Sequence, residues 1–229
     1  MDKTFAPFHS SGPAEAAVHL LLAHGAGAPM TSPFLDAIAA AMAGQGVAVH
    51  RFEFAYMAAR REAVARRRPP PHVDTLIPEF IAQAEALSAR LSQPIAIGGK
   101  SMGGRIATMA ARTLYLRGIA DCCVCLGYPF HPVGQPAKLR TGHLGETGCR
   151  LLIVQGTRDP FGTRAEVESY GLSSAIDFAW LDGADHDFKP ARHSGRTSSD
   201  HFAEAARVAA TFAASPAASA RIVNGNPSS

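Results

Sequence analysis

Short runs of consecutive apolar residues constrain the fold of this chain more than any other feature. Residues 122–126 and 151–154 are two such runs, each only long enough for one strand. A strand with one solvated face would alternate apolar and polar residues, so these runs predict strands that are buried on both faces. Further strands are predicted at residues 18–23, 47–54, 94–99 and 176–181.

The segments between these strands carry apolar residues at helical spacing. The clearest is residues 73–91, where apolar side chains recur every three or four positions. Ser32 precedes another such segment, at 34–42, as a candidate N-cap. Two more helices are predicted at 105–116 and 201–212. Strands that alternate with helices predict the α/β class, with a mostly parallel, doubly wound sheet, right-handed crossovers and helices on both faces.

The size of the chain sets further limits. With 229 residues, 47% of them hydrophobic, the chain is long enough for one α/β domain with a large core. We expect a single domain over residues 1–229, with its core at about 17–212, a flexible tail at about 215–229 and no separate cap domain. No run approaches 18 uncharged apolar residues, so no membrane span is expected.

Charge and cysteine content argue against several kinds of partner. The 22 basic and 19 acidic residues leave a net charge of +3, which is too small to predict a nucleic-acid partner. The four cysteines, at positions 122, 123, 125 and 149, lack the paired spacing of a zinc site and are expected to be reduced. The first residues show no basic segment that leads into an apolar stretch, so we expect a cytoplasmic protein.

The sequence Gly99-Lys100-Ser101-Met102-Gly103 matches the G-x-S-x-G pattern, directly after a predicted strand and before a predicted helix. This pattern predicts a turn so sharp that larger side chains at the two glycines would collide with neighbouring backbone. The serine then adopts a strained conformation with its hydroxyl exposed, as a nucleophile requires. The alternative is a glycine-rich packing turn or a phosphate loop, but no G-x-x-x-x-G-K-[ST] sequence is present.

A serine nucleophile needs a histidine base and an acid that orients the histidine. In the chain order that accompanies this pattern, the acid follows a later strand and the histidine follows the last strand. Asp159 and His186 occupy these two positions. Asp185 and Asp187 flank His186, but adjacent side chains diverge, so Asp159 is the better candidate. We therefore predict Ser101, Asp159 and His186 as the catalytic residues.

The reaction also needs backbone N–H groups that stabilise a developing oxyanion. One donor is expected at Met102, the residue after the nucleophile. The second is expected in the turn after the first core strand, at Ala26, with Gly25 and Gly27 as alternatives. Small residues there let main-chain amides approach a substrate closely, although a simple tight turn would also use them. Candidate substrate-binding residues in the neighbouring loops are His24, Tyr128, Phe130 and His131.

Residues 60–71 combine a basic cluster with three prolines. Arg66, Arg67 and Arg68 are expected to lie in a solvated loop, which the prolines stiffen into an extended connector. The alternative is that the cluster binds an anionic ligand, because this loop should leave a strand at the same edge as the glycine turns.

Taken together, the motifs resemble those of the α/β-hydrolase superfamily. They are HGAGA at 24–28, GGKSMGG at 98–104, QGTRDPFG at 155–162 and GADHDF at 183–188. More narrowly, the spacing of GGKSMGGR at 98–105, CLGYPFHP at 125–132, QGTRDPFG at 155–162 and DHDF at 185–188 resembles a small hydrolase-like family that contains testis-expressed proteins and homologues of chromatin-complex subunits. This resemblance covers about residues 17–212. Dienelactone hydrolases are similar in size but carry cysteine at the position of Ser101. The resemblance implies that Ser101, Asp159 and His186 are the triad positions.

The function that these observations favour is a serine hydrolase that cleaves an ester, thioester or similar acyl bond through an acyl-enzyme intermediate. It needs no metal or cofactor, and its partner is expected to be a small-molecule acyl substrate, with an anionic one left open. Neither nucleic acid nor a membrane is an expected partner. The alternative is a non-catalytic protein that uses the fold as an interaction platform. A nucleic-acid-binding module based on the three arginines is disfavoured by the near-neutral charge. The acyl group, the leaving group and the oligomeric state stay open.

Overall fold

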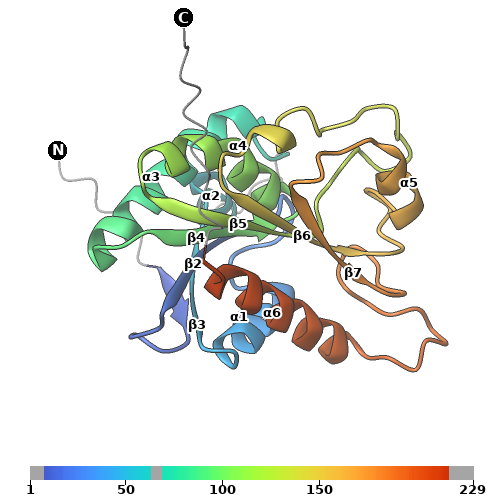
Figure 1. Cartoon of the computed structure of the whole chain (residues 1–229), viewed down its shortest axis with the longest axis horizontal. Coiled ribbons are helices and arrows are strands. Elements are labelled where there is room, and N and C mark those ends of the chain that lie inside the picture. Colours follow the sequence, from blue (N-terminus) through green and yellow to red (C-terminus); the bar gives the residue numbers. More distant parts are fainter. Residues whose placement is uncertain (1–7, 63–68, 217–229) are drawn as a thin grey trace, which may run out of the picture.

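The computed structural model describes residues 8–62 and 69–216, and a seven-stranded sheet forms its centre (Figure 1). The strands are β1 (His9–Ser11), β2 (Val18–Ala23), β3 (Val47–Phe52), β4 (Ile95–Lys100), β5 (Ala120–Leu126), β6 (Arg150–Gly156) and β7 (Ile176–Leu181). They lie in the order β1-β3-β2-β4-β5-β6-β7. The short edge strand β1 runs antiparallel to β3, and all the other neighbouring strands are parallel.

The parallel register brings the carboxyl ends of the central strands to one edge of the sheet. Ala23 at the end of β2 lies opposite Gly99 of β4, and Lys100 at the end of β4 lies opposite Leu126 of β5. The segments that leave these strands therefore meet at one edge. In open α/β sheets, this is the edge at which ligands bind.

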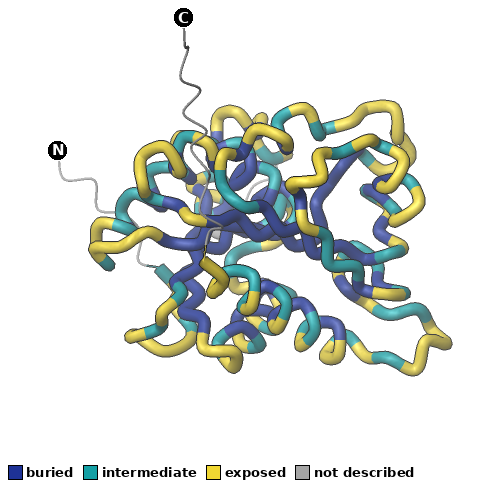
Figure 2. The backbone as a smooth tube through the Cα atoms, in the orientation of Figure 1, coloured by how far each residue is buried: buried dark blue, intermediate teal, exposed yellow. Residues whose placement is uncertain are grey.

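Helices cover both faces of this sheet (Figure 1). On one face, α1 (Pro33–Ala43) packs against α6 (Ser198–Ala214), and on the other face α3 (Val73–Leu91) packs against α4 (Met102–Leu116). The shorter elements are α2 (Ala55–Glu62), the 3-10 turn η1 (Leu144–Glu146) and α5 (Arg164–Ser169). Figure 2 shows buried strands between helices whose outer sides are exposed. The apolar side chains between these layers form two cores, one on each face of the sheet.

The strand β5 shows why the central runs are apolar throughout. Cys123 and Cys125 belong to the core on the α3 and α4 side, whereas Cys122 and Val124 belong to the core on the α1 and α6 side. Both faces of this strand are therefore buried, as the sequence predicts. All four cysteines are free thiols, and burial raises the pKa of the Cys122 thiol to about 12. This agrees with the expectation that the cysteines are reduced and fill the core.

The predicted α/β fold class is confirmed, and all six predicted strands and all four predicted helices are present. The candidate cap is also found, since the Ser32 hydroxyl accepts a hydrogen bond from the Leu35 N–H (3.4 Å). Two helix starts are wrong, because α4 begins at Met102 rather than at residue 105 and α6 begins at Ser198 rather than at residue 201. The sequence pattern assigns the glycines after Met102 to the turn, but they lie in the first turn of the helix, where a larger side chain would collide with backbone.

The sequence analysis missed β1, α2, η1 and α5, which have three to eight residues each and are too short to show a period. In the part of the chain that the structure describes, no helix has the length and apolar character needed to cross a membrane. The arginines at 66–68 lie outside the described residues, and so does most of the predicted tail, from residue 217 onwards.

Candidate active site

Ser101 lies on the sharp turn between β4 and α4. Its backbone has a φ of 53° and a ψ of −116°, which is a rare and strained conformation for a residue other than glycine. The turn leaves no room for side chains at its two glycines. A Cβ at Gly99 would collide with the carbonyl carbon of Gly103, and a Cβ at Gly103 would lie 2.5 Å from the carbonyl oxygen of His24. The G-x-S-x-G pattern thus reflects close backbone packing around the serine.

His186 and Asp159 approach the same edge from two different strands. His186 follows β7 and Asp159 follows β6, and the His186 Nδ1 lies 2.7 Å from the Asp159 Oδ2. Asp159 is fully buried, and its Oδ1 accepts a hydrogen bond from the Phe161 N–H (2.8 Å). The ring of Phe161 lies against the His186 ring, with 4.4 Å between the centroids. The imidazole is therefore held by a carboxylate on one nitrogen and by an aromatic ring on one side.

The two acidic neighbours of His186 make other contacts. The Asp185 Oδ1 accepts the backbone N–H groups of Asp187 and Lys189, both at 2.9 Å. The Asp187 carboxylate lies 3.7 Å from the Lys100 Nζ. Neither carboxylate hydrogen-bonds to the imidazole within the described residues, so the structure pairs His186 with Asp159, which is the acid that the chain order selects.

Gln155 is a positioning residue that the sequence analysis did not find. It lies at the end of β6 and is fully buried, and its Nε2 donates to the Asp159 Oδ2 at 2.9 Å. The same Nε2 lies 3.2 Å from the carbonyl oxygens of Tyr128 and Gly162, and the Oε1 accepts the Tyr128 N–H at 2.7 Å. One side chain thus joins the ends of β5 and β6 and fixes the carboxylate. The signal that could have revealed it is a single glutamine at the end of an otherwise apolar strand.

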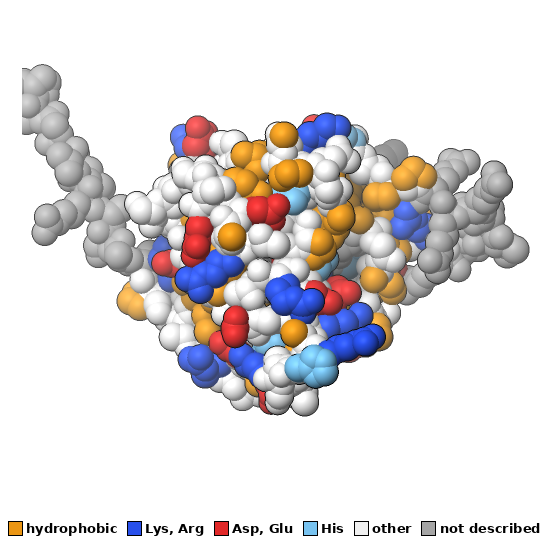
Figure 3. Space-filling view, turned by 90° about the vertical axis from the view of Figure 1, so that its right-hand side faces the viewer, with side chains coloured by type: hydrophobic (Ala, Val, Ile, Leu, Met, Phe, Trp, Pro, Cys, Tyr) orange, Lys and Arg blue, Asp and Glu red, His pale blue; other side chains and the backbone are white. Residues whose placement is uncertain are grey.

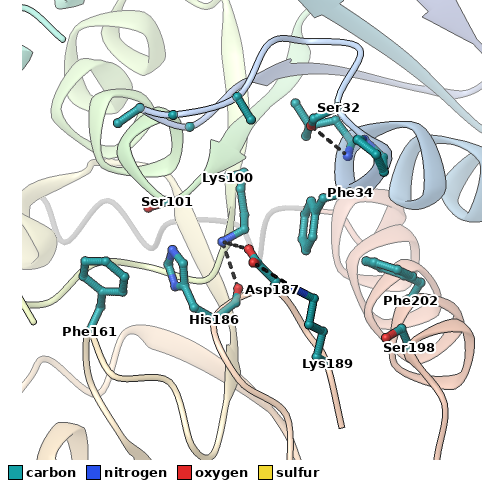
Figure 4. Close-up of a pocket in the computed structure, with 16 residues that line it drawn as sticks. Ser32, Phe34, Lys100, Ser101, Phe161, His186, Asp187, Lys189, Ser198 and Phe202 are labelled. Carbon is teal, nitrogen blue, oxygen red and sulfur yellow. Dashed lines mark hydrogen bonds and ion pairs between the residues drawn. The ribbon is translucent and has the colours of Figure 1, made fainter. Parts of the chain in front are cut away.

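Lys100 was also missed, although it lies inside the motif. Its Nζ donates a hydrogen bond to the carbonyl oxygen of His186 (2.8 Å) and lies 5.0 Å from the centre of the Phe34 ring. Burial lowers the pKa of this amine to about 8, and the nearby Asp187 opposes the shift. Lys100 therefore ties the end of β4 to the loop that carries His186 (Figure 4).

The backbone turn after β2 is held by side chains on its outer side. The His24 Nδ1 donates to the Gly25 carbonyl oxygen (2.7 Å), while the His24 Nε2 accepts the Phe54 N–H (3.1 Å). Burial, with a contribution from the positive charge of Arg60, lowers the pKa of His24 to about 4, so the ring is neutral near pH 7. The Ala26 carbonyl oxygen accepts hydrogen bonds from Arg60 (3.1 Å) and from the Tyr56 hydroxyl (3.3 Å). The turn is therefore fixed by contacts to its carbonyl groups.

Ser101 and His186 line a common cavity of about 550 Å³ at this edge of the sheet. Figure 4 shows Phe161 and His186 on one side of this cavity and Phe34 and Phe202 on the other, with Lys100 between them. The other lining residues come mainly from the turn after β2 and from the start of α1, and they include Gly25, Ala26, Gly27, Ala28, Ser32, Asp187, Lys189 and Ser198.

A second cavity, of about 500 Å³, also reaches Ser101. It shares Ala26, Ser101 and Phe161 with the first cavity. Its other lining residues belong to the start of α3, the start of α4 and the loops after β5, and they are Pro70, Pro71, His72, Val73, Met102, Arg105, Pro129 and Arg140. Ser101 thus lies where two cavities meet.

The four candidate substrate-binding residues line neither cavity. His24, Tyr128, Phe130 and His131 are all buried, with at most 2% of each exposed. The Tyr128 hydroxyl donates to the carbonyl oxygen of Arg140 (2.7 Å), and Tyr128 and Phe130 are part of the core. Their contacts support the loops around the cavities, and the geometry gives them no surface that a substrate could touch. Among the described residues, no group of three or more His, Cys, Asp or Glu side chains could hold a metal ion.

The fold and the site geometry are those of an α/β hydrolase, and comparison of the sequence with known families agrees. Residues 16–214 match the family described as an alpha/beta hydrolase domain, and the chain belongs to this family. The superfamily predicted from the motifs is thereby confirmed. A search of curated proteins found no match, so the narrower resemblance to testis-expressed and chromatin-complex homologues stays a prediction.

Solved structures of similar fold include three that cover nearly the whole chain. A serine hydrolase without a lid from Xanthomonas campestris is 17% identical, with a TM-score of 0.63 over 90% of this chain and 88% of that one. A dienelactone hydrolase from Anabaena variabilis is 20% identical, with a TM-score of 0.66 over 89% and 88% of the two chains. The esterase domain of a Rhodothermus marinus protein is 18% identical, with a TM-score of 0.61 over 89% and 90%. These similarities show that the fold is shared.

Proposed function

We propose that the protein is a serine hydrolase that cleaves an ester, thioester or similar acyl bond, with Ser101 as the nucleophile, His186 as the base and Asp159 as the acid that orients the base. The proposal rests on one observation about the arrangement of these side chains. A serine in a strained backbone conformation shares a cavity with a histidine whose Nδ1 is hydrogen-bonded to a buried carboxylate. A serine that only packs in a turn has no need of such partners.

The direction of proton transfer follows from the hydrogen bond between His186 and Asp159. In the neutral imidazole, the carboxylate favours the tautomer with the proton on Nδ1, which leaves Nε2 free to accept the Ser101 hydroxyl proton. The Ser101 oxygen then attacks the acyl carbon and forms a tetrahedral intermediate. As the intermediate collapses, His186 gives the proton to the leaving group, and the acyl group stays on the serine. A water molecule, deprotonated in turn by His186, releases the acid.

The backbone N–H groups of Met102 and Ala26 are proposed to stabilise the oxyanion of this intermediate. Met102 is the first residue of α4, and its N–H is one of the amides that the helix itself does not use. The peptide bonds of the turn after β2 are trans. An N–H group points away from the carbonyl of the same trans peptide. Because His24 holds the Gly25 carbonyl, the Ala26 N–H points away from His24. Gly25 and Gly27 remain the alternative donors.

The cavity walls support a small-molecule acyl substrate. Phe34, Phe161 and Phe202 give the first cavity apolar walls, and both cavities are a few hundred Å³ in size, which is typical of small-molecule sites. The four free cysteines fit a reducing compartment, so we place the protein in the cytoplasm.

The competing proposal is a protein that only binds partners, as the narrower family resemblance allows. Such a protein has no physical need for a strained serine beside a histidine–carboxylate pair. Nucleic acid is a poor candidate partner, because the net charge of the chain is only +3. On the face in Figure 3, basic and acidic side chains are interspersed.

The proposal is tested by hydrolysis of p-nitrophenyl esters of graded chain length by the wild-type protein and by Ser101→Ala. Ser198→Ala is the matched control, because Ser198 lines the same cavity at the start of α6. We expect Ser101→Ala to abolish turnover and Ser198→Ala to keep it. Equal turnover of all three proteins would show that Ser101 is not the nucleophile.

A further inference from the structure

The second cavity differs from the first in its charge. Two arginine side chains line it, Arg105 from the first turns of α4 and Arg140 from the loop between β5 and η1. Ser101 is part of the same lining, so both arginines face the cavity that reaches the serine. The first cavity combines two lysines with the Asp187 carboxylate. The lining of the second cavity contains no acidic residue.

Arg105 is placed close to the nucleophile by the helix. Its N–H donates to the Ser101 carbonyl oxygen (3.0 Å), so the two residues are one helical turn apart on the same side of α4. Long side chains on helices lean towards the helix N-terminus, which for Arg105 is the direction of Ser101. The Arg105 Nε is buried and has no hydrogen-bond partner among the described residues. A buried donor without an acceptor is costly, so this nitrogen indicates a missing partner.

Arg140 is held in place through its backbone, which leaves its guanidinium available. Its N–H donates to the Phe130 carbonyl oxygen (2.8 Å), and its own carbonyl accepts the Tyr128 hydroxyl. Burial and the neighbouring Arg105 charge lower the pKa of the Arg140 guanidinium. Burial and the same Arg105 charge also lower the pKa of His143. Arg105 therefore lies near both Arg140 and His143.

Four other arginines among the described residues have acidic partners. Arg51, Arg117, Arg164 and Arg196 form ion pairs with Asp36, Glu85, Glu168 and Glu204. Within the described residues, neither Arg105 nor Arg140 forms such a pair. Two neighbouring guanidinium groups without a carboxylate, in a cavity that opens on a nucleophile, fit a planar anionic group of a ligand, because arginine binds carboxylates through two parallel hydrogen bonds.

The position of His186 determines which half of a substrate enters each cavity. His186 must give a proton to the leaving group, and it lines the first cavity but not the second. The leaving group therefore lies in the first cavity. The acyl group, which stays on Ser101, then extends into the second cavity, towards the two arginines.

We propose that Arg105 and Arg140 form a subsite for a carboxylate at the far end of the acyl group, so that the substrates are monoesters or monothioesters of dicarboxylic acids. This inference rests on the proposed hydrolase function. The reaction consumes one water and releases the dicarboxylic acid and the alcohol or thiol, while the second carboxylate is bound and not changed.

The test compares p-nitrophenyl hydrogen adipate with p-nitrophenyl hexanoate, which have acyl chains of equal length and differ in charge. We expect the wild-type protein to prefer the adipate ester in kcat/KM by roughly 10- to 100-fold, the effect of hydrogen bonds to a charged group. Arg105→Gln and Arg140→Gln should lose this preference and keep their activity on hexanoate within about 3-fold. Arg207→Gln, at an exposed position on α6, is the matched control and should keep the preference.

A second pair of esters places the carboxylate on the leaving group instead. Phenyl hexanoate and 4-carboxyphenyl hexanoate should respond equally to both arginine substitutions. A wild-type protein that hydrolyses adipate and hexanoate esters equally well would overturn the subsite. So would arginine variants that lose activity on all esters alike, because that result indicates a structural role.

Binding of free adipate separates this inference from the proposed function. Calorimetry with Ser101→Ala should show adipate binding that disappears when Arg105→Gln is added, and inorganic phosphate should bind more weakly. Adipate binding without any ester hydrolysis would overturn the hydrolase and leave an anion site. Hydrolysis without adipate binding would leave the hydrolase and overturn the subsite. Equal binding of phosphate would overturn the assignment to carboxylate.

Discussion

Replacing Gln155 with leucine removes the side chain that fixes the proposed catalytic acid. The amide is fully buried, and it accepts the Tyr128 N–H at 2.7 Å and donates to the Asp159 carboxylate at 2.9 Å. Leucine is similar in size, so the change removes hydrogen bonds without opening a large cavity. The Tyr128 carbonyl keeps a second donor, the Phe130 N–H, and loses less.

The magnitude follows from the two strongest contacts. A buried N–H without an acceptor costs about 1–3 kcal/mol, and a hydrogen bond to a charged group contributes about 1.5–3 kcal/mol. The free energy of unfolding should therefore fall by about 2.5–6 kcal/mol. For a domain of this length, each kcal/mol lowers the Tm by about 2–4 °C, so a fall of roughly 5–24 °C is expected. Because Asp159 loses one of its hydrogen bonds, kcat should fall by about tenfold, which corresponds to ~1.4 kcal/mol.

Gln83 provides the matched control. It is also buried, in α3, but its Oε1 has no hydrogen-bond partner among the described residues. Gln83→Leu should therefore change the Tm little and leave kcat unaltered. Thermal unfolding and ester hydrolysis of both variants test this difference between the two glutamines. If Gln155→Leu unfolds at the same temperature as Gln83→Leu and is equally active, the role assigned to the buried amide is refuted.

Three further predictions concern the acid, the turn and the effect of pH. Asp159→Asn should keep the fold and lower kcat by about 10⁴, as for the corresponding change in serine proteases, because an amide no longer favours the reactive tautomer of the histidine; a fall of less than tenfold in a steady-state assay would contradict this. Gly103→Ala should lower the free energy of unfolding by about 1–3 kcal/mol through overpacking against backbone, whereas Gly142→Ala, with open space at its Cβ position, should be neutral in urea unfolding. Burial lowers the pKa of both His24 and His50 to about 4, so the unfolded chain binds more protons between pH 6.5 and 4, and each ring should cost about 3 kcal/mol of stability as the pH falls through this window. His50→Gln should show a smaller loss in urea unfolding at pH 4.5 than the wild type, and an equal loss would count against the assignment.

The parts of the fold that the sequence predicts are those determined by local pattern. Residues 122–126 of β5 form an uninterrupted apolar run because both faces of the strand are buried there, and residues 151–154 of β6 show the same pattern. The chain order of serine, acid and histidine then selects Asp159 and His186, because the ends of parallel strands meet at one edge. These features follow from the order of the strands along the chain.

The candidate substrate-binding residues that the sequence placed wrongly lie in the turns and loops after the strands. Tyr128 and His131 come soon after β5, and their place in the sequence predicts that they reach the ligand edge. Gly127 adopts a φ of 66°, and after this turn both side chains are buried. Residue types do not specify the direction of such a turn. The sequence also does not predict that Arg105 and Arg140 line the same cavity, since Arg105 lies on a helix and Arg140 lies on a loop far along the chain.

The central claim is that Ser101 is an activated nucleophile, and covalent labelling tests it most directly. The protein is treated with a fluorophosphonate and digested, and the modified peptide is identified by mass spectrometry. We expect one phosphonyl group per chain, on Ser101, with labelling that is much slower in Asp159→Asn and absent in Ser101→Ala. No label on the wild-type protein, or a label on Ser198 in the same cavity, would contradict it.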